Sequence, residues 1–297
     1  MDAEALTGEH CDLLVGYDGS PSAAGAIEYG ARLLPDALVR IVHLWAPPFA
    51  NVELRRRVSR KARSLDELQS LLEEEGAADA ERIAREGVAL ATGAGWAAQP
   101  LTDRPLSAEG FAFARLAEDL RPAAVVVGSK GLSGMRAVLG SVSDFVVYHS
   151  PAPVLVVPHP LLADEREAAA AGPVVAGHDG SSGAQRALAT AGSLFAGREL
   201  VVATAGMSAV DSELLAEAGA GAAEAVRLDP RGVAQNARAV AEALAACAAE
   251  RGAAVIVVGS RGQSAHRSIL LGSVALAALH HAHRPVLVVP DPHRFAR

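Results

Sequence analysis

Two stretches rich in glycine and serine follow apolar runs and have the composition of a phosphate-binding loop. The first, GSKGLSGMRAVLGS, covers residues 128–141, and the second, GSRGQSAHRSILLGS, covers residues 259–273. Glycine removes side-chain bulk, so backbone N–H groups can approach a phosphate closely. Each stretch ends in Gly-Ser where a helix is expected to begin, and a helix start adds unpaired amides and the positive end of the helix dipole. The pattern predicts an anion site at the end of each loop.

An aspartate accompanies each loop earlier in the chain. Asp18 lies in VGYDGS and Asp179 lies in the similar AGHDGS, each directly after a short apolar run. A carboxylate there could accept hydrogen bonds from a ribose or a base, and ligands of parallel α/β sheets bind beyond the carboxyl ends of the strands. The combination predicts a nucleotide cleft. Structural alternatives stay open, because the glycines could make only a strand-to-helix turn with a capping serine, and the aspartates only turns and caps.

Other motifs fit less well or have a simpler interpretation. The sequence contains no G-x-x-x-x-G-K-S/T loop and no G-x-S-x-G nucleophile elbow. Residues 93–98 match G-x-G-x-x-A, but they follow a predicted helix instead of a strand. His280, His281 and His283 could bind a metal, although a histidine-rich helix end also complements the helix dipole, and no metal site is expected. The basic residues between Arg55 and Arg63 are interpreted as a solvated helix face.

The chain contains one internal repeat. Besides the glycine loops and the aspartate segments, PVLVVP occurs at residues 153–158 and again at 285–290. The offset between the copies is 161 residues at the aspartates, 131 at the start of the loops and 132 from the end of the loops onward. The second copy has therefore lost 30 residues before its loop and gained one within it. This self-similarity indicates two duplicated domains.

Strands are expected to alternate with helices in both copies. The short valine-rich runs lack polar alternation, which is typical of a parallel sheet covered on both faces. The predicted fold class is α/β, with two tandem doubly wound domains, each a five-stranded parallel sheet with helices on both faces, at residues 1–160 and 172–297, joined by a linker at 161–171. In the first copy strands are expected at 12–17, 37–45, 97–102, 123–128 and 152–157, and helices at 21–34, about 51–93, 107–120 and 141–150, with Ser64 and Glu67 as a capping box. In the second copy strands are expected at 174–178, 199–204, 222–228, 254–259 and 285–289, and helices at 182–196, 232–250 and 273–282.

Composition narrows the function further. The net charge of −7 argues against a general nucleic-acid-binding protein, which needs a basic face. The N-terminus, MDAEALTGEH, does not have the pattern of a signal peptide, and no apolar run is long enough to span a membrane. Cys11 and Cys247 make no disulfide framework and are expected to be reduced thiols. We therefore expect a cytoplasmic protein with neither nucleic acid nor membrane as a partner.

The chain resembles a tandem universal stress protein over nearly its whole length. The ATP-binding members of that family carry G-x2-G-x9-G-S/T after the fourth strand and an aspartate after the first. The second copy matches in full at Gly259, Gly262, Gly272 and Ser273, whereas the first copy has only eight residues between Gly131 and Gly140. The resemblance implies binding of ATP, with or without Mg²⁺. It also implies pairing of the two halves through strands 153–158 and 285–290, and a homodimer is a further option.

The resemblance also implies roles for individual residues. Asp18 would contact the adenosine, and main chain near Val42 and His43 would contact the base. The ribose and phosphate path would be lined by Val127, Gly128, Lys130 and Gly131. The phosphates would be held by Gly140, Ser141, Val142 and Ser143. The matching set in the second copy is Asp179, Val258, Gly259, Arg261, Gly262, Gly272, Ser273 and Val274. Ala275 stands where the first copy has Ser143, so one hydroxyl is missing there.

The favoured function is an adenine-nucleotide-binding regulator of a stress response. No general base is recognisable beside the phosphates and no nucleophile has an orienting partner, so no catalytic residue is expected. A slow ATPase and a nucleotide-free interaction module are the alternatives. The shorter loop of the first copy predicts a weaker phosphate site, because removing one residue from a helix rotates all subsequent residues by about 100°.

Overall fold

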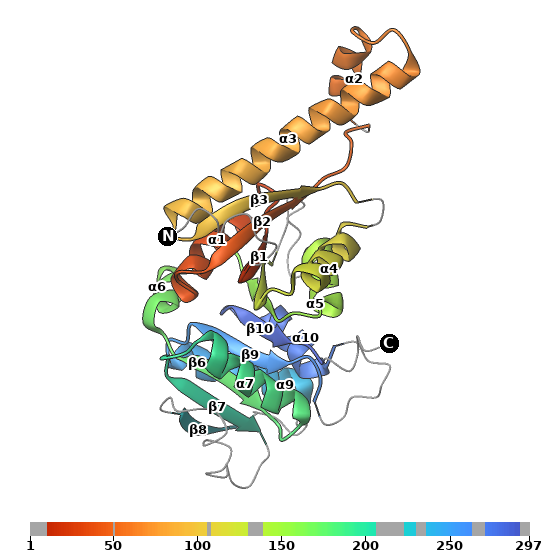
Figure 1. Ribbon diagram of the computed structural model, residues 1–297. Coiled ribbons are helices and arrows are strands. Elements are labelled where there is room, and N and C mark those ends of the chain that lie inside the picture. The colour runs from red at the N-terminus through yellow and green to blue at the C-terminus, as the bar shows by residue number, and fades with distance from the viewer. Residues whose placement is uncertain are drawn as a thin grey trace.

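One continuous sheet of ten strands runs through the molecule (Figure 1). The computed structural model describes residues 11–49, 51–105, 108–129, 139–205, 223–229, 236–262 and 271–291. The strand order is β3-β2-β1-β4-β5-β10-β9-β6-β7-β8. Strands that pair within β1–β5 (half one) or within β6–β10 (half two) run parallel, as expected for a doubly wound fold. The predicted α/β class is confirmed, with five parallel strands in each half, and the two sets of strands join into one sheet.

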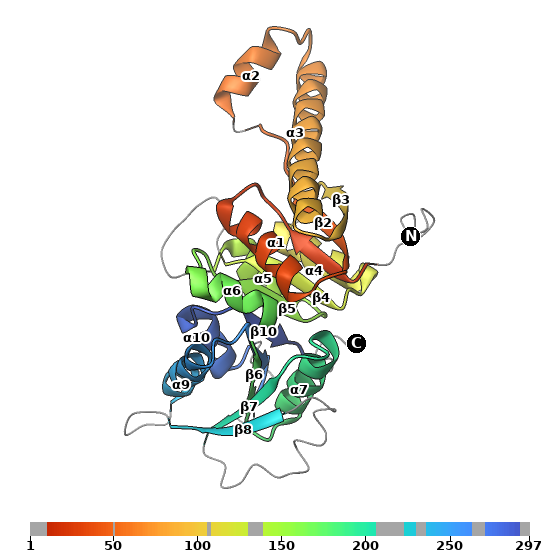
Figure 2. The same cartoon turned by 90° about the vertical axis from the view of Figure 1, so that its left-hand side faces the viewer.

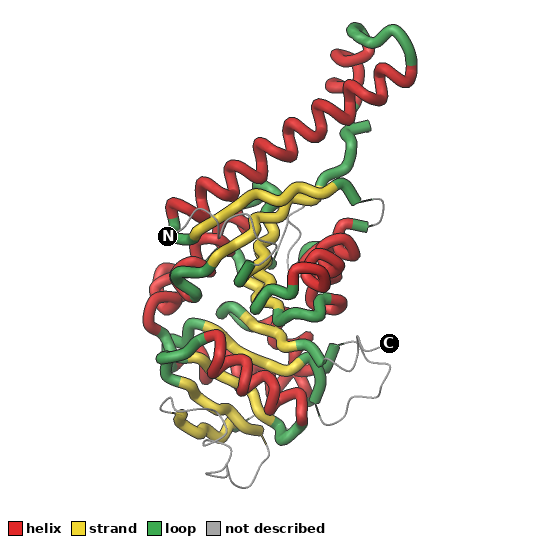
Figure 3. Tube along the Cα trace, viewed as in Figure 1, coloured by secondary structure: helices red, strands yellow, loops and turns green. Residues whose placement is uncertain are grey.

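The strands and helices follow the expected order along the chain (Figure 3). The strands are β1 (Leu13–Gly16), β2 (Leu38–Leu44), β3 (Ala97–Asp103), β4 (Ala124–Gly128), β5 (Val154–Val157), β6 (Val174–His178), β7 (Leu200–Ala205), β8 (Ala223–Leu228), β9 (Val255–Gly259) and β10 (Val286–Val289). The helices are α1 (Pro21–Leu33), α2 (Val52–Ser59), α3 (Leu65–Gly93), α4 (Glu109–Leu120), α5 (Ser141–His149), α6 (Ala163–Ala171), α7 (Ser182–Leu194), α9 (Ala237–Glu250) and α10 (Ser273–His281).

Both faces of the sheet are buried, and each core layer passes from one half into the other. Alternate residues of a strand enter opposite layers, so that Leu13 packs on one face and Leu14 on the other. The first layer contains apolar residues of α1 and α7, and the second contains residues of α4, α5, α9 and α10. Burial on both faces explains why the strands read as continuous valine-rich runs.

The two halves join through their last strands. β5 and β10 run antiparallel, with Leu155 opposite Leu287 and Val156 opposite Val286. Both leucines are buried. The predicted pairing of the two PVLVVP strands is thereby confirmed, and each strand covers an edge that would otherwise expose unpaired backbone groups.

The segment expected to link the halves forms helix α6. The backbone N–H of Leu162 donates to the carboxylate of Glu165 at 2.7 Å, and both Glu165 and Ala169 are buried. The helix packs against α1 of half one. The residues between the two sheets are therefore part of the packed structure.

The long helical stretch expected over residues 51–93 is two helices, α2 and α3. The N-terminal part of α3 and the whole of α2 extend beyond the sheet (Figure 2). Ser64 caps α3 as predicted, accepting a hydrogen bond from the N–H of Glu67 at 3.1 Å. The Glu67 carboxylate bonds the N–H of Arg63, one residue before the cap, instead of closing the expected capping box on Ser64.

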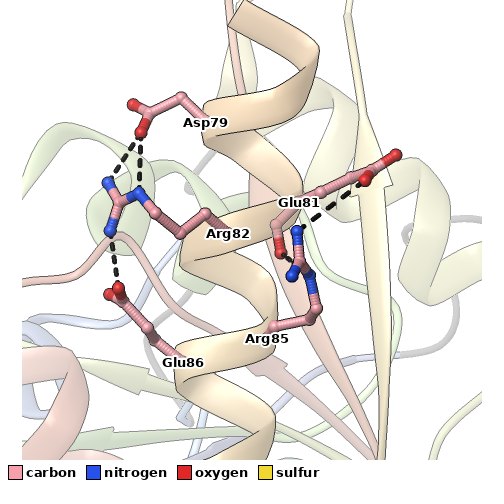
Figure 4. A network of polar contacts seen from close by, with 5 residues as sticks. All are labelled: Asp79, Glu81, Arg82, Arg85 and Glu86. Atoms are coloured by element: carbon pink, nitrogen blue, oxygen red, sulfur yellow. Dashed lines mark hydrogen bonds and ion pairs between the residues drawn. The ribbon is translucent and has the colours of Figure 1, made fainter.

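Ion pairs cover the solvent face of α3. Arg82 lies between Asp79 and Glu86, one turn away on either side, and Arg85 lies near Glu81 (Figure 4). These charges keep one face of α3 in water while its small residues Ala80, Ala84, Gly87 and Ala91 are buried. No helix in the described ranges is both long enough and apolar enough to cross a bilayer.

Candidate functional site

Each half contains a cavity at the carboxyl ends of its central strands. Cavity one has a volume of about 280 Å³ and cavity two about 320 Å³. Cavity one is lined by Gly16, Tyr17, Asp18, Ala23, Val42, His43, Leu44, Glu109, Phe113, Val127, Gly128, Gly140, Ser141, Val142 and Ser143. Cavity two is lined by Gly177, His178, Asp179, Ala184, Ala203, Ala205, Leu228, Val240, Leu244, Val258, Gly259, Arg261, Gly262, Leu271, Gly272, Ser273, Val274, Ala275 and Leu276.

The cavities collect the residues singled out in the sequence. Every candidate residue that the structure describes lines one of the two cavities. Lys130 and Gly131 lie outside the described residues. The strands place the set: β1 and β4 lie side by side and end at cavity one, and β6 and β9 do the same at cavity two. The cleft expected between the first and fourth strands of each half is therefore present.

A helix N-terminus opens onto each cavity. Helix α5 begins at Ser141 after Gly140, and helix α10 begins at Ser273 after Gly272; neither glycine can provide a side-chain cap. The first amides of a helix have no carbonyl partner within that helix, and they carry the positive end of its dipole. Residues 141–143 and 273–275 of these first turns line the cavities. This end of each cavity is suited to an anion.

The glycine before each helix closes the loop instead of offering its own amide. The N–H of Gly140 donates to the carbonyl of Ser129 at 2.9 Å, and the N–H of Gly272 donates to the carbonyl of Ser260 at 2.6 Å. We expected Gly140 and Gly272 to hold phosphates, and their N–H groups are already bonded. The donors of the first helical turn therefore come from the residues after these glycines.

Ser143 does not direct its hydroxyl proton to a ligand. Its hydroxyl donates to the carbonyl of Gly128 at 2.7 Å, and the side chain is buried. In this structure the hydroxyl ties α5 to the end of β4, and the expected phosphate contact through it stays a prediction. Ala275 in half two lacks this structural hydrogen bond.

Asp18 and Asp179 combine a turn role with a place in the cavity. One carboxylate oxygen of Asp18 accepts from the N–H of Ser20 at 2.9 Å, and one of Asp179 accepts from the N–H of Ser181 at 3.0 Å. Ser20 then caps α1. The turn interpretation is therefore supported for one oxygen of each carboxylate. A Cβ placed on Gly262 would lie 2.5 Å from Oδ2 of Asp179, so the loop packs directly against this carboxylate.

The end of β2 reaches cavity one at Val42, His43 and Leu44. The carbonyl of Val42 accepts from the N–H of Tyr17 at 2.9 Å, and Nδ1 of His43 lies 2.9 Å from the carbonyl of Tyr17. Burial raises the pKa of Tyr17, and the carboxylates of Glu86 and Asp18 raise it further, so its hydroxyl stays protonated. The His43 ring is held by the carbonyl of Tyr17, the residue directly after β1.

Several cavity residues were missed in the sequence. Tyr17 and His178 occupy the same position of the repeated aspartate segment, so the repeat itself contained the signal. Glu109 and Phe113 lie four residues apart on α4, which places them on one helix face. Position 109 corresponds by the offset of 131 residues to Val240, so a carboxylate in one cavity stands where the other has an apolar side chain.

Thiol and metal chemistry find little support in the described part of the chain. Burial raises the pKa of Cys11 and of Cys247, which keeps both thiols protonated and poorly nucleophilic. The rings of His280 and His281 lie 6.5 Å apart edge to face. No group of three or more potential metal ligands occurs among the residues that the structure describes.

Comparison with known proteins agrees with the fold. A model of the universal stress protein family matches residues 12–158 and 171–290. A universal stress protein from Archaeoglobus fulgidus DSM 4304 is 19% identical, with 94% of this chain and 97% of that chain covered and a TM-score of 0.64. A protein from Pseudomonas aeruginosa UCBPP-PA14 is 14% identical, with 96% and 95% covered and a TM-score of 0.56. A comparison with curated proteins gave no significant match.

Proposed function

The chain belongs to the universal stress protein family, and from that premise we propose that it binds an adenine nucleotide, ATP foremost, as a regulator in a stress response. The observation that carries this proposal is the uncapped helix start at each cavity, since the first-turn amides of α5 and α10 face a hollow that lies beside an aspartate. The phosphates would lie on these amides, with or without Mg²⁺ as their counter-ion.

The remaining cavity surfaces suit the adenosine part. In cavity one, Val42, Leu44, Phe113 and Val127 provide an apolar wall next to the end of β2. In cavity two, Ala203, Ala205, Leu228 and Leu244 provide the corresponding wall. A flat apolar base fits between such walls, and the second oxygen of Asp18 or Asp179 would accept a hydrogen bond from the ribose.

The polar groups at the phosphate end favour binding over turnover. The groups that would hold the phosphates are backbone amides, serine hydroxyls and Arg261, none of which acts readily as a base toward water. The carboxylates of Asp18, Asp179 and Glu109 also line the cavities, and one oxygen of Asp18 and one of Asp179 are already bonded to a backbone N–H. A buried, protonated thiol in each half supports the proposal of a cytoplasmic, reducing environment.

Identification of the small molecule that copurifies with the chain tests the proposal. The purified protein is denatured, and the released compounds are identified by mass spectrometry. We expect an adenine nucleotide in an amount comparable with the protein. If nothing is released and the protein also fails to bind added ATP, the nucleotide function is wrong and the interaction-module alternative gains support.

A further inference from the structure

Three charged side chains meet beside the phosphate end of cavity two and form what we call the Arg186–Asp291–Arg261 triad. Arg261 belongs to the glycine loop and lines cavity two, Arg186 comes from α7, and Asp291 comes after β10. Nη1 of Arg261 lies 3.4 Å from Oδ2 of Asp291, and Nη2 of Arg186 lies 3.2 Å from Oδ1. The side chains are 18%, 15% and 29% exposed for Arg261, Asp291 and Arg186, so water screens them only partly.

Half one has no such triad. By the repeat offsets, Gly25 stands in place of Arg186, His159 in place of Asp291 and Lys130 in place of Arg261. A Cβ on Gly25 would lie 3.4 Å from Nδ1 of His159, so these two positions are neighbours in half one as well. The two positions are neighbours in both halves, but they hold the oppositely charged pair Arg186 and Asp291 only in half two.

The triad holds more positive charge and more hydrogen-bond donors than its carboxylate can satisfy. Two guanidinium groups share one carboxylate, which leaves a net charge of about +1. Both contacts are longer than the roughly 2.7–2.9 Å usual for charge-assisted N–H···O bonds. Nε of Arg186 and Nε of Arg261 are buried and have no partner among the described residues. An anion beside Arg261 would meet this positive charge, while the carboxylate of Asp179, which also lines cavity two, lies against Gly262.

We propose that Arg186 and Asp291 set the charge that Arg261 presents to the terminal phosphates, so that half two favours ligands with a long phosphate chain. The inference rests on the proposed nucleotide binding. Asp291 alone would neutralise Arg261. Arg186 takes up part of the Asp291 carboxylate and so leaves Arg261 partly unopposed at the cavity. Arg186 is thus a positioning residue, since it acts through Asp291 and is not itself part of the cavity lining.

A series of variants in the full chain changes the net charge of the triad in single steps. Arg186→Ala lowers it from +1 to about 0, Asp291→Asn raises it to about +2, and the double variant returns it to about +1. We expect the affinity for ATP relative to adenosine to fall roughly tenfold in Arg186→Ala, a change of about 1.4 kcal/mol. The ratio should rise in Asp291→Asn and return close to the original value in the double variant, while Arg186→Lys retains it.

The measurement must separate the two halves within one chain. The protein is photolabelled with 8-azido-adenosine in the presence of increasing ATP or unlabelled adenosine, and labelled peptides from each half are quantified by mass spectrometry. Peptides of half one provide an internal reference in every sample. His159→Ala is the matched control in half one, and thermal unfolding verifies that each variant is folded.

Different results overturn different parts of the proposal. If neither ATP nor adenosine displaces the label from half two of the unaltered protein, the proposed function fails there, and the inference fails with it. If ATP displaces the label but the ratio of ATP to adenosine affinity is the same in all variants, only the triad inference is wrong. A fall of that ratio in Asp291→Asn would show that Asp291 holds Arg261 in place, which also overturns the charge-sharing role.

Discussion

Single glycines in the second loop face protein atoms as well as the proposed ligand. A Cβ on Gly262 would lie 2.5 Å from Oδ2 of Asp179, and one on Gly272 would lie 3.3 Å from the carbonyl oxygen of Ser260. A Cβ at position 262 would force a shift of the loop or of the Asp179 carboxylate, whose other oxygen is bonded to the N–H of Ser181. The requirement for glycine at position 262 therefore includes the packing of the loop against Asp179.

Gly262→Val and Gly272→Val should each abolish nucleotide binding to half two. The added branches push the loop away from Asp179 or from Ser260 and occupy the space of the phosphates. Calorimetry with ATP measures the loss. Gly93→Ala is the control, because a Cβ there meets nothing within 4 Å and alanine stabilises a helix by about 0.5–1 kcal/mol. Full binding in both valine variants would show that the loop has only a structural role.

Ser143→Ala should affect stability more than binding. Its hydroxyl donates to the carbonyl of Gly128 in a buried position, so the free energy of unfolding should fall by about 0.5–1.5 kcal/mol. Ala275 shows that half two folds without this bond. Urea denaturation and ATP calorimetry test the two effects separately. A loss of ATP affinity at unchanged stability would instead place the hydroxyl on the ligand.

At the scale of elements, the missing loop residue does not displace the next helix. Helices α5 and α10 both begin directly after the glycine, with similar cap angles, and both glycine amides bond the serine at the loop start. Gly140 therefore makes the same contact with the start of its loop as Gly272 does, and the weaker phosphate site expected of half one stays a prediction. Residues 130–138, where the two loops differ in length, lie outside the described residues.

Helix α1 reaches half two through one buried tyrosine. The hydroxyl of Tyr29 donates to the carbonyl of Ala254 at 2.7 Å, and burial raises the pKa of this phenol. A raised pKa in the folded state stabilises the fold below the unfolded value of about 10 and loses that contribution as the pH rises further. We expect stability to fall above pH ~10, and to fall less steeply in Tyr29→Phe.

Urea unfolding of both proteins between neutral and alkaline pH measures this difference. At neutral pH, Tyr29→Phe should be less stable by about 0.5–1.5 kcal/mol, because one buried hydrogen bond is lost. If the free energy of unfolding falls equally steeply with alkaline pH in both proteins, ionisation of Tyr29 does not contribute to the loss of stability.

The succession of strands along the chain and the pairing of the two PVLVVP strands were predictable because the sequence repeats its strands, with turn signals between them. The break between α2 and α3 was missed, since the basic residues around Arg60 favour helix and only Ser64 marks a new start. Cavity residues that belong to a loop motif could be identified from the sequence. Glu109 and Phe113 line cavity one because α4 packs beside it, and they belong to no motif, so the sequence alone did not identify them.

At the scale of the whole molecule, Arg198 connects both halves with α6. Its guanidinium donates to the carbonyls of Ala169, Gly172 and Leu33 at 2.6, 3.1 and 3.2 Å. Burial lowers the pKa of Arg198, so these carbonyls must offset the cost of holding its charge there. Together with the β5–β10 pair and the shared core layers, this side chain makes the two halves one packed unit.

Arg198→Ala should destabilise the chain by about 1.5–3 kcal/mol, because hydrogen bonds to a charged group are lost and the carbonyls remain buried. Arg115→Ala is the matched control, since Arg115 is exposed and forms an ion pair with the exposed Asp119 one turn away. Thermal unfolding compares the two. Equal melting temperatures would show that Arg198 contributes nothing to the connection of the halves.

The central claim is that the two cavities bind adenine nucleotide, and native mass spectrometry of the full chain during a titration with ATP tests it most directly. The proposed function predicts complexes with one and then two ATP molecules. Gly262→Val should remove the tighter site, because Arg261 lines cavity two beside the start of α10. A spectrum that shows only the free chain at high ATP, from protein stripped of copurified nucleotide, would contradict the claim.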